Sequence, residues 1–436
     1  MNPNEPWDVV VVGGGTAGIA AAIAAARQGA KTVVVERLGS FGGTQANGWV
    51  TPMMPNYIGD FKLSRGVNLD IIGAQESIQP AGELEHADEW YDPTMLSKVL
   101  DDLANEAGVT PLFDTSVVQA DVSNGSIRGI TVISRGRPFS LVGRCYVDAS
   151  GDAELGILTG AEIMSGNSQG VHQPMTLRFT MAGIDLGVAA EDLAPHLRIR
   201  SNGYLEAGFG EAKDGSMGHL VEEAIRRGTL YADDLGYFQF FTMNGRPGEL
   251  AFNCPRLTGF DPLDPFEMSR AYQIGRQKIM RIAKFMRESF AGFAGSYVST
   301  IAPLMGIRES RRIVGDYILT EEDHQDCRKF DDVVARNRYP VDIHLEKGID
   351  YRKFPPGEWH DIPYGAIVVR GFDNFWVAGR CASATFVAQS AIRIQPVCRA
   401  LGEAAGVAAS LCAQNNWSSR SLPYEELRGR LDLATP

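Results

Sequence analysis

Four consecutive β-branched residues, Val9 to Val12, begin the most regular hydrophobic pattern of the chain. Such a run is typical of a parallel strand that is buried on both faces. A glycine-rich turn follows, then an alanine-rich helix that we expect over Ile19 to Gln28, with Gly29 as its stop. Lys31 to Val35 is expected to form the second strand. The order of strand, turn, helix and strand predicts a βαβ nucleotide-binding unit.

The turn after the first strand carries the pattern G-x-G-x-x-G. Gly13 permits the tight turn, Gly15 lets the backbone approach a pyrophosphate, and Gly18 lets the helix pack close to the strand. Glu36 ends the second strand, where a carboxylate can accept hydrogen bonds from both hydroxyls of an adenosine ribose. Glu36 would repel a 2′-phosphate, but it does not separate FAD from NAD. The pattern predicts dinucleotide binding, and the alternative is a glycine-rich turn in another kind of α/β protein.

A second glycine-rich loop, Gly39 to Thr44, follows the second strand directly. Gly42 and Gly43 allow the backbone to pass close to a ligand, and Thr44 can donate its hydroxyl to a phosphate. Because of its position, we expect this loop to reach the same pyrophosphate; the alternative is an ordinary glycine turn.

The next stretches extend this fold. Asp92 as N-cap, Pro93 at the first helical position and Gly108 as stop predict a helix. The strand that follows is expected at 109–113. A β-meander is predicted from strand patterns at 117–121, 127–134 and 139–142. We expect the meander to be an insertion, after which the chain returns through a strand to a Ser-Gly-Asp turn at 150–152.

From about residue 161 the pattern changes. Strands are predicted at 175–181 and 237–243, and a long helix over 264–290. The chain then returns through predicted strands at 366–369 and 375–378, a loop, and a final helix from Pro396 to Cys412. We interpret residues 1–56, 92–160 and 361–436 as a discontinuous nucleotide-binding domain. Residues 57–91 and 161–360 are interpreted as a substrate or cap domain.

Composition narrows the function classes. The chain has 436 residues, 44% hydrophobic and 22% charged, with a net charge of −12 and no basic run that would favour nucleic acid. No apolar stretch reaches the length of a membrane span, and the sequence shows no secretory leader. Six scattered cysteines without C-x-x-C argue against a metal site or a redox dithiol. We therefore expect a reduced, cytoplasmic protein.

Several pieces of the sequence together resemble the FAD-dependent oxidoreductase family within the glutathione-reductase-like flavoprotein superfamily. They are VVVVGGGTAG (9–18), GSFGGT (39–44), YVDASGDAELG (146–156), GIRESRRIVGDYILTEED (306–323), DIPYGAIV (361–368) and the return at 374–409. The return is the most specific, because it joins an A-G-R turn to a glycine-containing helix. The resemblance implies an α/β fold: a Rossmann-like FAD-binding domain with a parallel sheet and a β-meander, plus a second α+β substrate domain.

The resemblance also implies which residues hold a non-covalent FAD. Gly13, Gly15, Thr16, Ala17 and Gly18 would take the pyrophosphate, Glu36 the ribose, and Arg37, Gly42, Gly43 and Thr44 the phosphates. Val117 or Val118 would place backbone at the adenine, and Ser150, Gly151 and Asp152 would line the nucleotide. Gly379 and Arg380 would lie at the ribityl chain, and Ile394 to Val397 would approach the flavin ring. An aspartate commonly follows this last glycine in the superfamily, and Arg380 stands there instead.

Three groups of side chains are candidates for substrate chemistry. Arg308, with Arg311 and Arg312, can clamp a carboxylate or polarise a carbonyl, and the alternative is a set of salt bridges to Glu309, Asp316 and Glu321. His172 and His360 are candidate general acid–base groups, and the alternative for each is an ordinary hydrogen-bonding role. Arg178 and Tyr364 are further candidates.

Only one complete G-x-G-x-x-G fingerprint occurs, and residues 165–300 offer no second one. We therefore expect no dedicated NAD(P)H site. The predicted function is an FAD-dependent dehydrogenase or reductase that acts on a small organic substrate by hydride transfer through flavin N5. A flavin monooxygenase and a flavin-bearing electron-transfer subunit with a redox partner are the alternatives. Non-redox use of the flavin and the oligomeric state both stay open.

Overall fold

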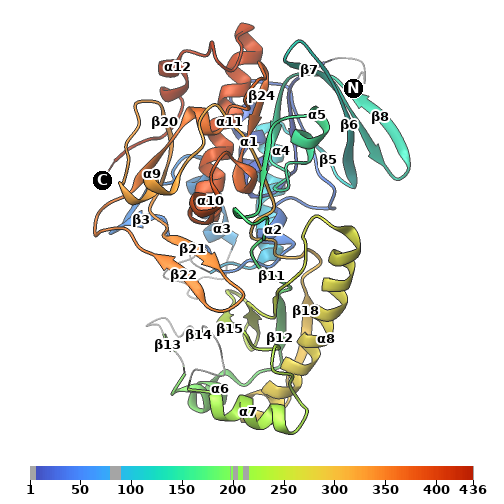
Figure 1. Ribbon diagram of the computed structural model, residues 1–436, viewed down its shortest axis with the longest axis vertical. Coiled ribbons are helices and arrows are strands. Elements are labelled where there is room, and N and C mark those ends of the chain that lie inside the picture. The colour runs from blue at the N-terminus through green and yellow to red at the C-terminus, as the bar shows by residue number, and fades with distance from the viewer. Residues whose placement is uncertain (1–5, 79–89, 197, 200–204, 210–215, 436) are drawn as a thin grey trace.

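The computed structural model describes residues 6–78, 90–196, 198–199, 205–209 and 216–435. Figure 1 shows two layers: a body that contains both ends of the described chain, and a smaller sheet with a long helix in the lower half of the view. Parts of the predicted substrate domain, at 79–89, 197, 200–204 and 210–215, lie outside the described residues.

A parallel sheet forms the centre of the larger body. Its strand β1 (Trp7–Val12) lies between β2 (Thr32–Val35) and β9 (Gly143–Asp148), and the sheet is completed by β5 (Thr110–Leu112) and β24 (Phe375–Val377). Val9 to Val12 are buried, as the run of β-branched residues predicts. The structure confirms the predicted α/β fold class with its parallel sheet.

Two helices from opposite ends of the chain pack against each other and against this sheet. They are α1 (Thr16–Arg27) and α11 (Gln395–Asn415). A Cβ at Gly402 or Gly406 would lie 2.0 Å from the carbonyl oxygen of Ala17 or Ala21, respectively. Glycine at these two positions therefore allows the helix backbones to touch. Helix α4 (Pro93–Ala107) begins at the Asp92 N-cap and ends at Gly108, as predicted.

The β-meander is confirmed as a three-stranded sheet. It comprises β6 (Thr115–Ser123), β7 (Ser126–Ser134) and β8 (Arg137–Leu141), all antiparallel. Its apolar positions, such as Ile130 and Val132, pack on the face of the parallel sheet opposite α1.

An antiparallel six-stranded sheet forms the smaller layer (Figure 1). In spatial order its strands are β13 (Arg198–Ile199), β14 (Leu205–Phe209), β15 (Phe238–Thr242), β16 (Leu250–Phe252), β12 (Phe179–Ala182) and β18 (Tyr297–Ile301). Helices α6 (Leu186–Leu193), α7 (Gly218–Arg226) and α8 (Pro265–Ser289) accompany it. The Asp264 side chain caps α8 by accepting hydrogen bonds from the backbone of Phe266 and Glu267. The apolar core of the smaller layer is formed by residues between Met175 and Met305. The domain limits given above stay a prediction.

Several further elements of the described chain are short. The short strand pairs are β3 (Tyr57–Ile58) with β4 (Phe61–Lys62), β10 (Ile163–Ser165) with β19 (Arg311–Ile313), β11 (Met175–Thr176) with β17 (Arg256–Leu257), β20 (Val333–Asn337) with β23 (His360–Pro363), and β21 (Val341–His344) with β22 (Ile349–Arg352). The short helices are α2 (Gly43–Ala46), α5 (Glu154–Thr159), α9 (Glu321–Gln325), α12 (Tyr424–Arg428) and the 3-10 turns η2 (Ala291–Phe293), η3 (Tyr364–Ala366) and η4 (Gly379–Cys381).

Two local predictions are wrong. Residues 366–369 do not form a strand; they leave η3 and make only isolated bridges, because an apolar run marks burial without fixing the backbone. The loop expected before α11 contains helix α10 (Phe386–Ile392), which the Thr385 side chain caps. A further helix, α3 (Val67–Ile78), which the sequence pattern does not predict, packs against α11 and α4.

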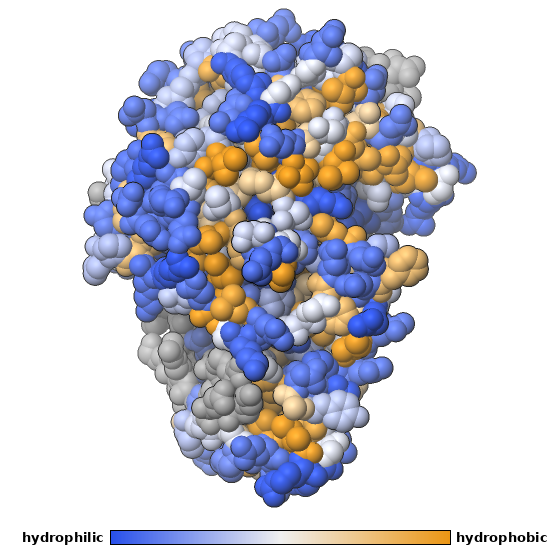
Figure 2. Space-filling model, viewed as in Figure 1, coloured by the Kyte–Doolittle hydropathy of each residue, from blue (hydrophilic) through white to orange (hydrophobic). Residues whose placement is uncertain are grey.

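Figure 2 shows hydrophobic residues in several groups separated by hydrophilic ones, over both layers of the visible face. Within the described part of the chain, no helix has both the length and the apolar character that a membrane span needs.

Candidate functional site

One cavity of about 520 Å³ runs between the parallel sheet and the smaller layer. Its nucleotide end is lined by residues 13–17, 36–38, 43–44, 149–151 and 379–380. We call the opposite part the distal end, and its charged and polar side chains include Arg178, Tyr237, Arg308, Asp342, His344 and Arg393. The volume is within the range typical of small-molecule sites.

Two glycine loops meet at the nucleotide end. Gly13 has φ of +93°, and a Cβ there would lie 2.6 Å from the carbonyl oxygen of Ala149. Gly43 has φ of +48°, and its Cβ would lie 2.8 Å from the Cα of Gly15. A Cβ at Gly13 would collide with the backbone that follows β9, and a Cβ at Gly43 would collide with the backbone of Gly15. Glycine at both positions therefore lets these segments pack closely at this end of the cavity.

The beginning of α1 faces this end of the cavity through Thr16 and Ala17. Its N-cap is Gly15, which has no side chain to occupy the first N–H groups of the helix. These N–H groups and the helix dipole favour an anion such as a phosphate.

Glu36 lies at the end of β2, as the spacing predicts. Its carboxylate accepts hydrogen bonds from the backbone N–H of Gly14 at 2.6 Å and of Leu38 at 2.8 Å. Burial raises the pKa of Glu36, and these two hydrogen bonds act in the opposite direction. The carboxylate is thereby held at the cavity wall, where it can accept from a ribose.

Two arginines border the nucleotide end and are held by acidic side chains. Arg37 Nη1 donates to Glu154 Oε1 at 2.9 Å, and Arg380 Nη2 donates to Asp152 Oδ1 at 2.9 Å. Asp152 also accepts from the hydroxyl of Ser310. Asp152 therefore orients Arg380 and does not itself line the cavity.

Four other predicted cofactor residues lie behind the cavity wall. Gly18 touches the backbone of Gly13, Gly42 is the left-handed N-cap of α2, Val397 is buried in α11, and Val117 lines a small adjoining cavity with Gly13 and Glu36. Gly13, Gly15, Thr16, Ala17, Glu36, Arg37, Gly43, Thr44, Ser150, Gly151, Gly379, Arg380 and Ile394 line the main cavity itself.

The beginning of α11 lies between the two ends. Ile394 is its N-cap and carries no capping side chain. Gln395 accepts from the backbone N–H of Met54 at 3.1 Å and donates to the carbonyl of Pro52 at 3.1 Å. These contacts fix the 50–54 segment as part of the cavity wall.

Two buried arginines dominate the distal end. Arg178 Nη1 donates to the carbonyls of Trp49 at 3.2 Å and Thr51 at 3.0 Å, and Arg308 Nη1 donates to the carbonyl of Pro174 at 2.6 Å. Within the described residues, neither guanidinium has a carboxylate at ion-pair distance. Burial, together with the charge of Arg393, lowers the pKa of Arg308 to about 9 and of Arg178 to about 10.

A smaller cluster contains the third arginine. Arg393 Nη2 donates to the carbonyl of Asp342 at 3.0 Å and to its Oδ2 at 3.3 Å, while the buried Nε of Arg393 has no partner among the described residues. Burial acts to raise the pKa of Asp342, but the hydrogen bond from His344 and the charge of Arg393 outweigh it and lower the pKa. Burial, with the charge of Arg308, lowers the pKa of His344 to about 3, so this imidazole is neutral.

The tyrosines at the distal end stay protonated. Burial raises the pKa of Tyr237, whose hydroxyl donates to Gln239 Oε1 at 2.8 Å. Burial and the nearby Asp342 raise the pKa of Tyr339. The distal end is therefore rich in hydrogen-bond donors and cations.

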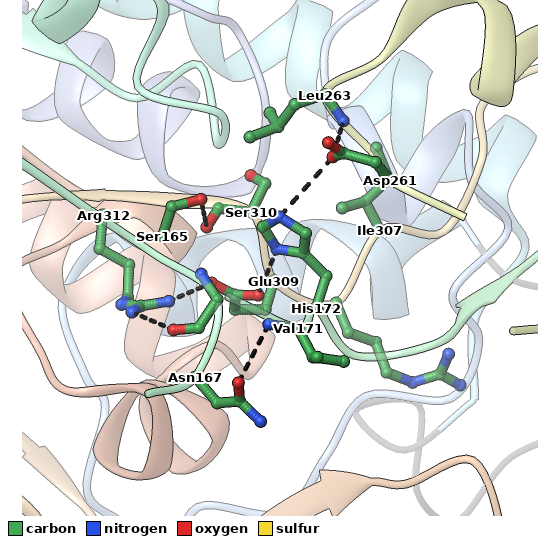
Figure 3. Close-up of polar contacts among 12 residues, drawn as sticks. Ser165, Asn167, Val171, His172, Asp261, Leu263, Ile307, Glu309, Ser310 and Arg312 are labelled. Carbon is green, nitrogen blue, oxygen red and sulfur yellow. Dashed lines mark hydrogen bonds and ion pairs between the residues drawn. The ribbon is translucent and has the colours of Figure 1, made fainter. Parts of the chain in front are cut away.

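The structure does not bring the two predicted histidines to the cavity. Figure 3 shows the His172 ring directed at Glu309, with Nδ1 and Oε2 2.8 Å apart. His360 is completely buried, its Nε2 lies 3.1 Å from Asn337 Nδ2, and burial lowers its pKa to about 3. Both positions agree with the hydrogen-bonding alternative.

The three arginines of GIRESRR separate in space. Arg308 reaches the cavity, whereas Arg312 forms a buried ion pair with Glu309 (Figure 3) and Arg311 lies in β19. Asp316 and Glu321 pair instead with Arg420 and Arg352. The three arginines of this motif therefore do not act as one group. Arg308 lines the cavity together with Arg178 and Arg393, which lie outside the motif.

Sequence reasoning missed Tyr237, Asp342, His344 and Arg393 at the distal end. Arg393 directly precedes Ile394 in the return motif, and that position could have signalled it. The other three have no local pattern. Tyr364, a further candidate, donates to the carbonyl of Ser419 at 2.9 Å and does not line the cavity.

The nucleotide end fits the phosphates and ribose of FAD. It offers close backbone approach at two glycine loops, uncapped N–H groups at α1, a ribose acceptor at Glu36 and cations at Arg37 and Arg380. This donor set is what a diphosphate with an attached ribose requires.

A comparison with known protein families also indicates an FAD-binding protein. The family described as FAD dependent oxidoreductase matches residues 8–431. Dihydrolipoyl dehydrogenase of Trypanosoma brucei brucei is 60% identical over 43 residues, which are 10% of this chain and 9% of that protein.

Solved structures give more extended but weaker likenesses. A geranylgeranyl bacteriochlorophyll reductase-like protein from Thermoplasma acidophilum is 14% identical, with a TM-score of 0.45 over 98% of this chain and 82% of that one. The p-nitrophenol 4-monooxygenase of Pseudomonas putida is 11% identical, with a TM-score of 0.47 over 96% and 83%. Likenesses this distant say nothing of the substrate.

Proposed function

The chain belongs to the FAD-dependent oxidoreductase family, and from that premise we propose that it oxidises or reduces a small organic substrate held at the distal end of the cavity. When bound, FAD supplies two-electron chemistry by accepting or donating a hydride at N5. The residues of the nucleotide end would hold it: the loops of Gly13 and Gly43, the N–H groups of α1, the carboxylate of Glu36, and Arg380.

The N-terminus of α11 would contribute between the two ends. Its uncapped N–H groups stabilise negative charge. Gln395 holds the 50–54 segment over this point through its two hydrogen bonds. The cavity that would hold both cofactor and substrate lies between the two layers.

At the distal end, the side chains bind and orient the substrate. Arg178 and Arg308 present positive charge, and Tyr237 and Tyr339 keep their hydroxyl protons because burial raises the pKa of both. His344 is neutral, with its Nδ1 3.2 Å from Arg256 Nη2, so a guanidinium proton faces that nitrogen. His344 Nε2 lies 3.5 Å from Asp342 Oδ1, and the imidazole is thereby fixed in orientation.

One observation carries the proposal: a single cavity joins the glycine-lined end to an end of arginine and tyrosine side chains. The test is anaerobic reduction of the purified flavoprotein with pools of small organic compounds, followed by visible absorbance. We expect one class of compound to bleach the flavin, and NADH and NADPH to leave it oxidised. Rapid bleaching by NAD(P)H, or purified protein that cannot be loaded with FAD, would contradict the proposal.

A further inference from the structure

The distal end holds more positive charge than its own acids neutralise. Arg178, Arg308 and Arg393 line it, against the carboxylates of Asp342 and Glu206. Asp342 is already engaged by Arg393 and His344. Arg178 and Arg308 are only 6% and 8% exposed, and buried guanidinium groups are normally paired with an acid.

The donors of Arg308 are largely unused by the protein. One hydrogen bond, from Nη1 to the carbonyl of Pro174, is its only side-chain contact of this kind within the described residues. Among the residues that the structure describes, the Arg178 side chain likewise donates hydrogen bonds only to two backbone carbonyls. A guanidinium has a planar fork of N–H groups that matches the two oxygens of a carboxylate.

From this arrangement we infer that the substrate is a small organic carboxylate, whose anionic group binds between Arg178 and Arg308 with Arg393 nearby. The inference rests on the proposed function, since it names the substrate class of the same cavity. Trp90, Tyr237 and Phe241 line the walls beside the arginines, so the body of the substrate would lie against aromatic rings.

The test compares matched acids and amides on FAD-loaded protein. Benzoate and benzamide share a shape, and so do acetate and acetamide, but only the acids carry charge. Flavin absorbance is recorded during each titration. We expect at least one acid to give a saturable spectral change at a concentration about tenfold or more below its amide, as a charge-assisted bidentate contact implies. Equal behaviour of acid and amide in both pairs would overturn the inference.

Variants locate the effect. Arg308→Lys keeps the charge but loses the fork, and we expect benzoate to bind roughly tenfold more weakly, while Arg308→Gln weakens it further. Arg178→Lys is the second variant, in case Arg308 variants do not fold. Arg227→Gln, at a side chain 48% exposed at the C-cap of α7, is the control and should leave binding unchanged.

Two readouts separate this inference from the proposed function. FAD content is measured on denatured protein before each titration. If Arg308→Lys loses FAD while its remaining holoprotein binds benzoate normally, the arginine serves the cofactor and the inference is wrong. If the wild type holds no FAD, the proposed function fails, and the acid–amide comparison is read from thermal unfolding, which reports on the same arginines.

Discussion

The nucleotide end of the cavity is made mainly of backbone, whereas the distal end is made of charged and aromatic side chains. The first is shaped by glycines at positive φ and by helix N-termini, and the second by Arg178, Arg308 and their neighbours. Backbone contacts suit a cofactor whose phosphates are the same in every enzyme that uses it. Side-chain contacts suit a substrate that must be distinguished from others.

We expect the largest effect from adding a side chain to a glycine at the nucleotide end of the cavity. Gly13→Ala places a Cβ 2.6 Å from the Ala149 carbonyl oxygen at a φ of +93°. We expect FAD content to fall by tenfold or more and the free energy of unfolding by about 3 kcal/mol. Gly39→Ala is the control, because a Cβ at Gly39 meets nothing within 4 Å. Equal FAD content in the two variants would show that the loop does not approach the cofactor.

At the distal end, we expect a substitution that strengthens ligand binding instead of weakening it. Asp342→Asn removes the carboxylate that Arg393 and His344 contact. We expect benzoate to bind severalfold more tightly, because more positive charge becomes available to it. The free energy of unfolding should fall by about 2 kcal/mol, since Arg393 loses its acid. Titration and denaturant unfolding measure the two effects, and weaker benzoate binding with FAD content intact would argue against charge as the basis of recognition.

Glu403, on α11, does not line the cavity, so a substitution there tests the stability of the larger body without changing the site. It accepts from the Val67 N–H at 3.1 Å, and burial raises its pKa to about 7. A carboxyl with a raised pKa binds a proton in the folded state, so its contribution is complete below the unfolded pKa and is lost as pH rises toward 7.

We therefore expect Glu403→Gln to remove a decline of about 2 kcal/mol in the free energy of unfolding between pH 5 and pH 8. Urea unfolding at several pH values measures this decline. Glu106→Gln, on an exposed position of α4, is the control. An unchanged decline in the Glu403 variant would place its cause elsewhere, and FAD content should stay constant in both variants.

The smallest effect concerns a cysteine. Cys398 lines the cavity, but burial raises its thiol pKa to about 12, so the thiolate is scarce at neutral pH. We expect Cys398→Ala to cost about 1 kcal/mol of stability and to leave FAD content unchanged. The partly exposed Cys327 should react first with iodoacetamide, as mass spectrometry of the alkylated peptides would show. Faster modification of Cys398 would indicate a reactive thiol at the site.

The same contrast explains what the sequence could predict. Much of the nucleotide end, at 13–17, 36–38 and 43–44, consists of residues close together in the chain, and 149–151 and 379–380 join it from distant segments. The glycine motif and Glu36, like the β-meander, are therefore predictable from local patterns in the sequence. The distal end joins Arg178, Tyr237, Arg308 and Arg393, which come from separate elements. Their approach depends on tertiary packing, and no local pattern contains it.

The histidines show the complementary problem. The sequence predicts His172 and His360 as acid–base groups because an imidazole can titrate near neutral pH. In the structure, Glu309 and Asn337 contact these two side chains away from the cavity. His344, which does line it, is the last residue of β21, a strand of ordinary appearance. A reactive residue type therefore identified the site less well than a backbone motif did.

The contact between α1 and α11 affects how the protein can be made. Gln414 Nε2 donates to the carbonyl of Gln28, 386 residues away along the chain. A ribosome that synthesises the chain from its N-terminus leaves α1 without this partner for a time on the order of tens of seconds. The helix that would bind the pyrophosphate is then incomplete as a folding unit, because non-local contacts must close first. Flavin loading is thus expected only after the whole chain has left the ribosome.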